Sequence, residues 1–171
     1  MFMTPMFKGD GLIFKGEYVE IVVADNSKNF TEFDGVNNKL KVFANRVDDF
    51  NLKRVLVKDW YLAESKRVFC DFIELWSNKT SLFPASLKIK KMRSRWGSCN
   101  YIKKSITLNL ELIKQKESFI EYVVLHEIAH LAHPNHGKGF HAFLKNHMPD
   151  YKLRRKSGRV NLNIEDFSNY I

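Results

Sequence analysis

Short runs of alternating or β-branched residues occupy the first 44 positions of the chain. The runs at 12–14, 17–23 and 39–44 have the apolar spacing of strands. They are separated by residues that favour turns, namely Gly9, Gly11, Gly16, Asp25, Asn26, Asp34 and Gly35. We therefore expect a small antiparallel meander in this part of the chain.

The period changes to that of a helix between about residues 51 and 77. Apolar residues recur there at three- and four-residue spacing, and charged residues fill much of the opposite face. The apolar positions are Leu52, Val55, Leu56, Leu62, Ala63, Phe69, Phe72, Ile73 and Trp76. This pattern predicts a long amphipathic helix. Cys70 falls on the apolar face and should be a small core residue.

Strand-like alternation returns at 86–90 and at 105–108, where apolar residues occupy every second position. The segment 97–100 lies between them and reads Gly-Ser-Cys-Asn, which is typical of a turn. The simplest interpretation is one β-hairpin that spans roughly residues 86–109.

Helical periodicity dominates the rest of the chain. It predicts a helix over 117–132, which should end there because Pro134 disfavours helix at the residue before it. Asn109 or Ser118 could cap the helical segment after the hairpin. Another helix is expected over 140–146, and the basic segment after it should be partly helical. Strands followed by helices indicate an α+β fold.

The length of 171 residues, with 44% hydrophobic and 27% charged residues, suits a globular protein with one core. We expect residues 1–50 to form a β-rich extension and residues 51–171 to form the functional core, with the two packed as one compact unit.

The cysteines and the hydropathy of the chain indicate in which cellular compartment the protein is expected. Cys70 and Cys99 lie far apart with no CxxC, which argues against a disulfide framework and fits a reducing cytoplasm. The apolar stretch 1–7 is interrupted by Lys8 and Asp10 too early for a signal-peptide core, and no window reaches transmembrane length. We expect a cytoplasmic protein without a membrane partner.

The net charge of +9 is concentrated in the second half of the chain. Residues 1–78 carry 11 basic and 12 acidic residues, whereas residues 79–171 carry 17 and 7. Residues 79–110 carry eight basic residues and no acidic one. A second basic cluster consists of Lys152, Arg154, Arg155, Lys156 and Arg159. Such a surface favours acidic substrates or polyanions such as nucleic acid, although charge runs are also common as solvated faces.

One motif in the basic half carries metal chemistry. His126 and His130 are four residues apart, so on a helix both imidazoles leave the same face and can reach one ion. Glu127 points about a hundred degrees away, where it could reach a metal-bound water without ligating the metal. This is the HExxH pattern of zinc hydrolases.

A catalytic zinc ion usually takes three protein ligands, so a third must come from elsewhere. His136, beyond the Pro134 turn, is the favoured candidate, and His133 is the nearest competitor. The remaining alternatives are His141, Asp150 and Glu165. His133, His141 and His147 could equally be surface residues, or could orient water or a carbonyl group.

Four segments together resemble the YgjP-like metallopeptidases, a family related to the SprT-like zinc proteases. They are RSRWGSC at 93–99, ITLN at 106–109, EYVVLHEIAHL at 121–131 and NHGKGF at 135–140. The resemblance implies a zincin-like fold with Zn²⁺ at His126, His130 and His136 and with Glu127 as catalytic base. His141 is a departure, because relatives commonly carry a tryptophan there.

Further residues are candidates for substrate contact. A tetrahedral oxyanion needs an electrophilic partner, for which Arg93, Arg95, His133 and Tyr151 are candidates, and Tyr151 could equally be core. The predicted hairpin could bind an extended substrate by β-addition, with the turn at 96–99 (Trp-Gly-Ser-Cys) nearby. Trp96 and Cys99 could equally pack the hairpin onto the motif helix.

The leading functional hypothesis is a zinc-dependent metallopeptidase that hydrolyses peptide bonds with a zinc-bound water activated by Glu127. A first alternative is a zinc hydrolase of nucleotides or other small anionic substrates, although no Gly-rich phosphate loop is present. A second is a nucleic-acid-associated module that acts on DNA-bound proteins and whose protease activity is secondary.

Overall fold

The computed structural model of the chain describes residues 4–5 and 11–158. These residues form two compact units, 4–5 with 11–64 and 65–158. Strands and helices occur in both, so the predicted α+β fold class is confirmed. Helix α1 (Phe50–Thr80) contributes its first half to the first unit and its second half to the second.

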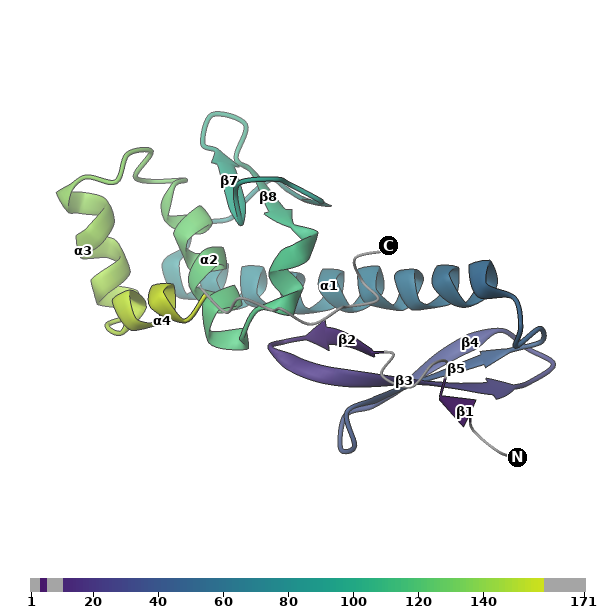
Figure 1. Cartoon of the computed structure of the whole chain (residues 1–171). Coiled ribbons are helices and arrows are strands. Elements are labelled where there is room, and N and C mark those ends of the chain that lie inside the picture. Colours follow the sequence, from purple (N-terminus) through teal and green to yellow (C-terminus); the bar gives the residue numbers. More distant parts are fainter. Residues whose placement is uncertain (1–3, 6–10, 159–171) are drawn as a thin grey trace. The chain divides into compact units, whose positions relative to one another are not determined.

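The first unit contains a five-stranded sheet with the order β1-β3-β5-β4, and β2 also pairs with β3 (Figure 1). Its strands are β1 (Thr4–Pro5), β2 (Gly11–Phe14), β3 (Glu17–Asp25), β4 (Phe30–Asp34) and β5 (Lys39–Ala44). Residues 21–24 of β3 are all buried, which fits a strand that has neighbours on both sides.

The prediction of a simple antiparallel meander is wrong in one pairing. Strands β3 and β5 are parallel, from Glu20 opposite Lys39 to Asp25 opposite Ala44. The sequence reasoning missed β4, which pairs with β5 as an antiparallel hairpin and returns the chain in the direction of β3. The alternating charges of β4 hid it, because both of its faces are partly exposed.

A predicted turn joins two strands of this sheet, and aromatic residues pack the sheet against α1. Lys15 and Gly16 both have positive φ, 54° and 85°, as a two-residue hairpin between β2 and β3 requires. The Trp60 ring lies 5.2 Å from Phe14 and 5.3 Å from Phe33 between centroids. An aromatic cluster therefore lies between the sheet and the first half of the helix, next to a fully buried aliphatic core that includes Leu12, Ile21 and Leu40.

The helix predicted at 51–77 is confirmed as α1, but its buried face differs in detail. The fully or nearly buried apolar residues are Val57, Trp60, Tyr61, Val68, Phe69 and Trp76. Val55 and Leu62, which the periodicity assigned to the core, are 48% and 36% exposed. Cys70 is also exposed, because it lies one residue and hence about 100° beyond Phe69.

The second unit contains a three-stranded sheet and four short helical segments. They are β6 (Ser86–Lys90), β7 (Gly97–Asn100), β8 (Ser105–Asn109), the 3₁₀ helix η1 (Leu110–Lys114), α2 (Glu117–Ala129), α3 (Lys138–His147) and α4 (Tyr151–Ser157). Helix α2 contacts β7, β8, η1, α3 and α4. The motif helix is thus the central element of this unit.

The predicted hairpin over 86–109 is corrected. Strand β6 runs parallel to β8, and only β7 and β8 form a hairpin, with the sheet order β6-β8-β7. The segment 97–100, interpreted as a turn, is itself strand β7. The turn lies at 101–104, where the Asn100 side chain accepts a hydrogen bond from the Lys103 amide and Lys104 has a φ of 47°.

The motif helix also ends earlier than predicted. Helix α2 stops at Ala129, and the amides of Leu131 and Ala132 bond to carbonyls three residues back, which tightens the chain ahead of Pro134. Ser118 is not its cap, since Lys116 holds that position without a side-chain hydrogen bond. The helix over 140–146 and the partly helical basic segment are confirmed as α3 and α4. None of the described helices has the length and apolarity to cross a bilayer.

The burial pattern of α1 can be tested with two valines two residues apart. Val57→Ala should lower the free energy of unfolding by about 1.5–3 kcal/mol, because Val57 is fully buried and its loss leaves a cavity. Val55→Ala is the matched control and should stay within about 0.5 kcal/mol. Denaturant unfolding measures both. Equal losses would contradict the assignment of the buried face.

Candidate metal centre

Three imidazoles converge at the end of the motif helix. His126 lies in the last turn of α2, and His130 follows as its C-cap with φ −66° and ψ −16°, which is still helical. The two rings therefore share one face, with centroids 4.9 Å apart. The ligand atoms of His126, His130 and His136 all lie within 4.8 Å of one another.

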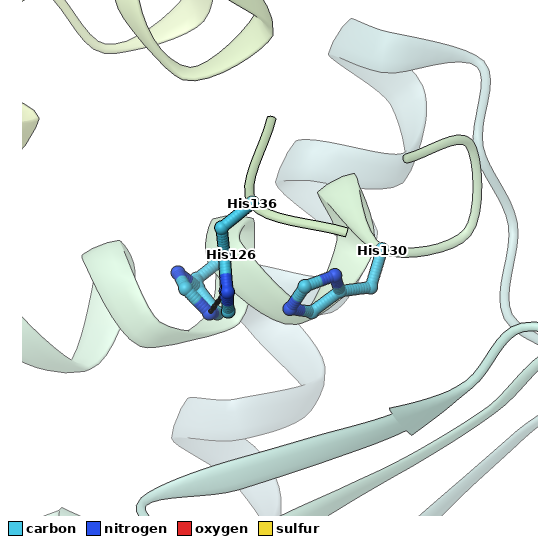
Figure 2. A group of neighbouring side chains, drawn as sticks. All are labelled: His126, His130 and His136. Atoms are coloured by element: carbon cyan, nitrogen blue, oxygen red, sulfur yellow. Dashed lines mark hydrogen bonds between the residues drawn. The ribbon is translucent and has the colours of Figure 1, made fainter. Parts of the chain in front are cut away.

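His136 reaches this face because the chain reverses between α2 and α3. The amide of His133 bonds to the Ala129 carbonyl at 2.9 Å, and the loop then returns through Pro134. The Nε2 atoms of His136 and His126 are 3.0 Å apart, and Figure 2 shows the three rings turned toward a common point.

The ring of Phe140 packs against all three imidazoles. Its centroid lies 4.9 Å from His126, 4.8 Å from His130 and 4.7 Å from His136, and the side chain is 1% exposed. Phe140 sits in the first turn of α3, so the start of that helix supports the histidines of α2 and of the loop.

Hydrogen bonds at Nδ1 orient the two helix histidines. The Nδ1 of His130 lies 3.0 Å from the His133 carbonyl oxygen, which can only accept, so Nδ1 carries the proton and Nε2 is free to bind a metal. The Nδ1 of His126 lies 3.3 Å from the Tyr122 hydroxyl, which can accept in the same way. Both rings thus present Nε2 to the common point.

Burial also favours the neutral rings that metal binding needs. Burial, together with the neighbouring His130 and His136, lowers the pKa of His126 to about 3. Burial likewise lowers the pKa of His130, while its bond to the His133 carbonyl opposes the shift. Neutral imidazole nitrogens are preferred ligands of zinc, so this donor set fits such an ion.

Glu127 lies beside the cluster and is 5% exposed. Burial raises its pKa to about 8, and the positive charge of Arg95 acts in the opposite direction. A Cβ atom at Gly97 would lie 2.6 Å from Oε1 and from Cγ of Glu127. The carboxyl group therefore occupies space that only glycine on strand β7 leaves open.

Asn109 fixes the loop that leads into β7. Its amide nitrogen donates to the carbonyls of Met92 and Arg95, both at 2.8 Å. Its carbonyl oxygen accepts from the amides of Met92 at 3.2 Å and of Glu111 at 3.1 Å. The residue predicted as a helix cap thus caps η1 and also holds the 92–96 loop, which carries Arg93, Arg95 and Trp96.

A protein-family model described as a YgjP-like metallopeptidase domain matches residues 3–158. The chain belongs to this family. The resemblance to YgjP-like metallopeptidases that the four sequence segments indicated is thus confirmed. Metallopeptidases are hydrolases that act on polypeptides. No curated protein matches the chain.

Two solved structures are similar to part of this YgjP-like chain. One is the metallopeptidase zymogen abylysin of Pyrococcus abyssi, with 18% identity, a TM-score of 0.47, and coverage of 52% of this chain and 89% of that one. The other is the metallopeptidase zymogen jannalysin of Methanocaldococcus jannaschii, with 22% identity, a TM-score of 0.44, and coverage of 50% and 91%.

The residues predicted to contact the substrate line different cavities of the structure. Arg95 lines a cavity of about 330 Å³ together with the three histidines and Glu127, and Trp96 lines an adjoining cavity of about 300 Å³. Arg93 lines neither and lies in a hollow beside Asn109.

His133 and Tyr151 lie outside both of these cavities. The His133 ring packs on Phe143, so it is the backbone carbonyl of His133 that touches the site. Tyr151 is 6% exposed and stacks on His141.

Sequence reasoning placed Gly97 and Cys99 near the centre, in an expected turn, but missed the contributions of Tyr122 and Phe140. Tyr122 carried a signal, because it precedes His126 by four residues on the same helix face. Phe140 carried no such signal. Cys99 lines the histidine cavity, where burial and then the charge of Glu127 raise the pKa of its thiol to about 11, so it stays protonated at neutral pH.

The role of Asn109 can be tested by an isosteric change. Asn109→Asp keeps the acceptor oxygen but removes the donor to two carbonyls, so it should lower the free energy of unfolding by about 2–4 kcal/mol. Asn100→Asp is the matched control, because Asn100 only accepts, and it should be nearly neutral. Thermal and denaturant unfolding distinguish them. A neutral Asn109→Asp would show that the loop does not depend on these bonds.

Proposed function

We propose that this YgjP-like protein is a zinc-dependent peptidase in which His126, His130 and His136 hold the metal and Glu127 is the general base. The observation that carries the proposal is the convergence of three imidazoles beside one buried carboxyl group. Three nitrogen ligands are the usual protein set of a catalytic zinc site that keeps one position open. Membership in a metallopeptidase family supports the same interpretation.

Zinc, when bound, supplies a Lewis acid that polarises the substrate carbonyl and brings the pKa of a water molecule to about 7. The positive charge of the ion also favours the ionised form of Glu127, against the effect of burial. Glu127 then accepts a proton from the attacking water and delivers it to the leaving amine. Arg95 shares the histidine cavity and supplies positive charge near the developing oxyanion.

Strand β7 is a suitable partner for an extended peptide. It lies at the edge of the three-stranded sheet and pairs only with β8 among the described strands. Gly97, Ser98 and Cys99 of this strand line the cavity of the three histidines. A substrate that pairs with β7 by β-addition would carry its backbone past Glu127.

The cellular setting is part of the proposal. The described cysteines, Cys70 and Cys99, are both free, which fits a reducing cytoplasm. The basic charge of residues 79–171 would attract acidic polypeptides, or proteins bound to DNA.

The ligand set can be tested by metal content. Alanine at His126, His130 or His136 should lower zinc affinity by more than about a hundredfold. Loss of a residue that only hydrogen-bonds to a metal ligand typically costs about 10–100-fold, and loss of a ligand itself should cost more. His147→Ala is the control, because that imidazole bonds to the Phe143 carbonyl within α3. Competition with a chelator and elemental analysis give the affinity. Retained stoichiometric zinc in His136→Ala would identify a different third ligand.

The catalytic role of Glu127 can be tested with the isosteric Glu127→Gln. This variant should keep its zinc and lose about 10²–10⁴-fold in cleavage of unfolded casein. Glu74→Gln, an exposed change on α1, should cleave at the wild-type rate. Absence of cleavage by the zinc-loaded wild type, or equal rates for wild type and Glu127→Gln, would disprove the proposed function.

A further inference from the structure

A second cavity adjoins the histidine cluster. Its volume of about 300 Å³ is at the small end of the range for ligand sites, which is roughly 300–1,000 Å³. It shares Gly97, His126 and Glu127 with the cavity that contains all three histidines. A group bound in it would therefore lie directly beside the proposed reaction centre.

Three aromatic side chains, Trp96, Phe119 and Tyr122, line the second cavity. Trp96 and Phe119 meet edge to face, with centroids 5.8 Å apart, and Phe119 lies 5.9 Å from Tyr122. Gly158 completes the lining, and a Cβ atom there would lie 2.2 Å from the Phe119 ring. These surfaces suit the aliphatic part of a substrate residue.

One cation, Arg155 of α4, lines this aromatic cavity. Its neighbour Arg154 is engaged by Asp150 and Glu121. Among the described residues, in contrast, Arg155 has no ion pair or hydrogen bond, and its side chain is exposed. Glu127 lines the same cavity, but no ion pair joins it to Arg155. An arginine that is not paired with a described acid, at the border of a ligand-sized cavity, can pair with a carboxylate from outside.

We propose that this cavity is a substrate subsite that takes a carboxylate-bearing group, with the aliphatic stem against Trp96 and Phe119 and the carboxylate on Arg155. The inference rests on the proposed peptidase function and specifies its substrate class as peptides that present a carboxylate at this subsite. The carboxylate comes from a glutamate side chain near the cleaved bond or from the C-terminus of the peptide. The two sources share one chemistry and are separated by the experiment below.

The first measurement is binding, which does not require turnover. Zinc-loaded Glu127→Gln is titrated with fluorescein-labelled peptides that differ only in one glutamate, glutamine or lysine. If a side chain supplies the carboxylate, the glutamate peptide should bind roughly five- to tenfold more tightly than the glutamine peptide, as one charge-assisted contact at a partly solvated site predicts. If the C-terminus supplies it, the free acid should instead bind more tightly than the amide by the same factor. Adding Arg155→Gln should abolish this difference, and adding Arg155→Glu should transfer the preference to the lysine peptide.

Lys156→Gln is the matched control. It removes the same charge from the next residue of α4, outside the lining of the cavity, so the glutamate preference should persist. Repeating each titration with C-terminally amidated peptides identifies the source of the carboxylate. An Arg155-dependent loss of affinity on amidation assigns it to the C-terminus, and no change on amidation assigns it to the side chain.

The second measurement is cleavage of the same peptides by the wild type, Arg155→Gln and Lys156→Gln, with products located by mass spectrometry. An Arg155-dependent preference for acidic peptides supports the subsite. Efficient cleavage with no Arg155-dependent preference, either for the glutamate peptide over the glutamine peptide or for the free C-terminus over the amide, overturns the subsite but leaves the peptidase intact. Absence of any cleavage overturns the peptidase function, while the binding titration still decides whether Arg155 recognises a carboxylate.

Discussion

The contact of one phenylalanine ring with three imidazoles is the constraint on which the rest of the centre depends. Phe140 is buried in the first turn of α3 and touches His126, His130 and His136 at similar distances. It joins the helix that supplies two histidines to the loop that supplies the third. The chain must reverse between α2 and α3 for this contact to form, and the early end of α2 at Ala129 makes that reversal possible.

The same centre also depends on a glycine, Gly97 of strand β7, which leaves room for the Glu127 side chain. The Glu127 carboxyl group occupies the space that a Cβ atom at Gly97 would fill. Strand β7 can come this close because Asn109 holds the preceding loop through the carbonyls of Met92 and Arg95 and the amide of Met92. The sheet therefore positions the proposed base by close backbone approach, and a substrate that paired with β7, as we propose, would pass the same point.

Local periodicity predicted most elements of this chain, because strand and helix spacing depend on neighbouring residues. It placed α1 within a few residues and recovered β2, β3, β5, β6 and β8. It failed where pairing is decided at long range. Strands β3 and β5, and likewise β6 and β8, are parallel, and nothing in their own residues distinguishes that from the expected antiparallel order. The prediction for Cys70 also failed, because the buried face of α1 includes Phe69 but not the next residue, Cys70, which is exposed.

The sequence by itself determined the candidate histidines and Glu127, since a four-residue spacing on a helix puts His126 and His130 on one face whatever surrounds them. It also indicated His136, since a turn at Pro134 shortens the path back. Only the tertiary structure decided which groups surround them. Phe140, Gly97 and Arg155 reach the centre from three separate elements, and side-chain packing between such elements has no period that a sequence can display.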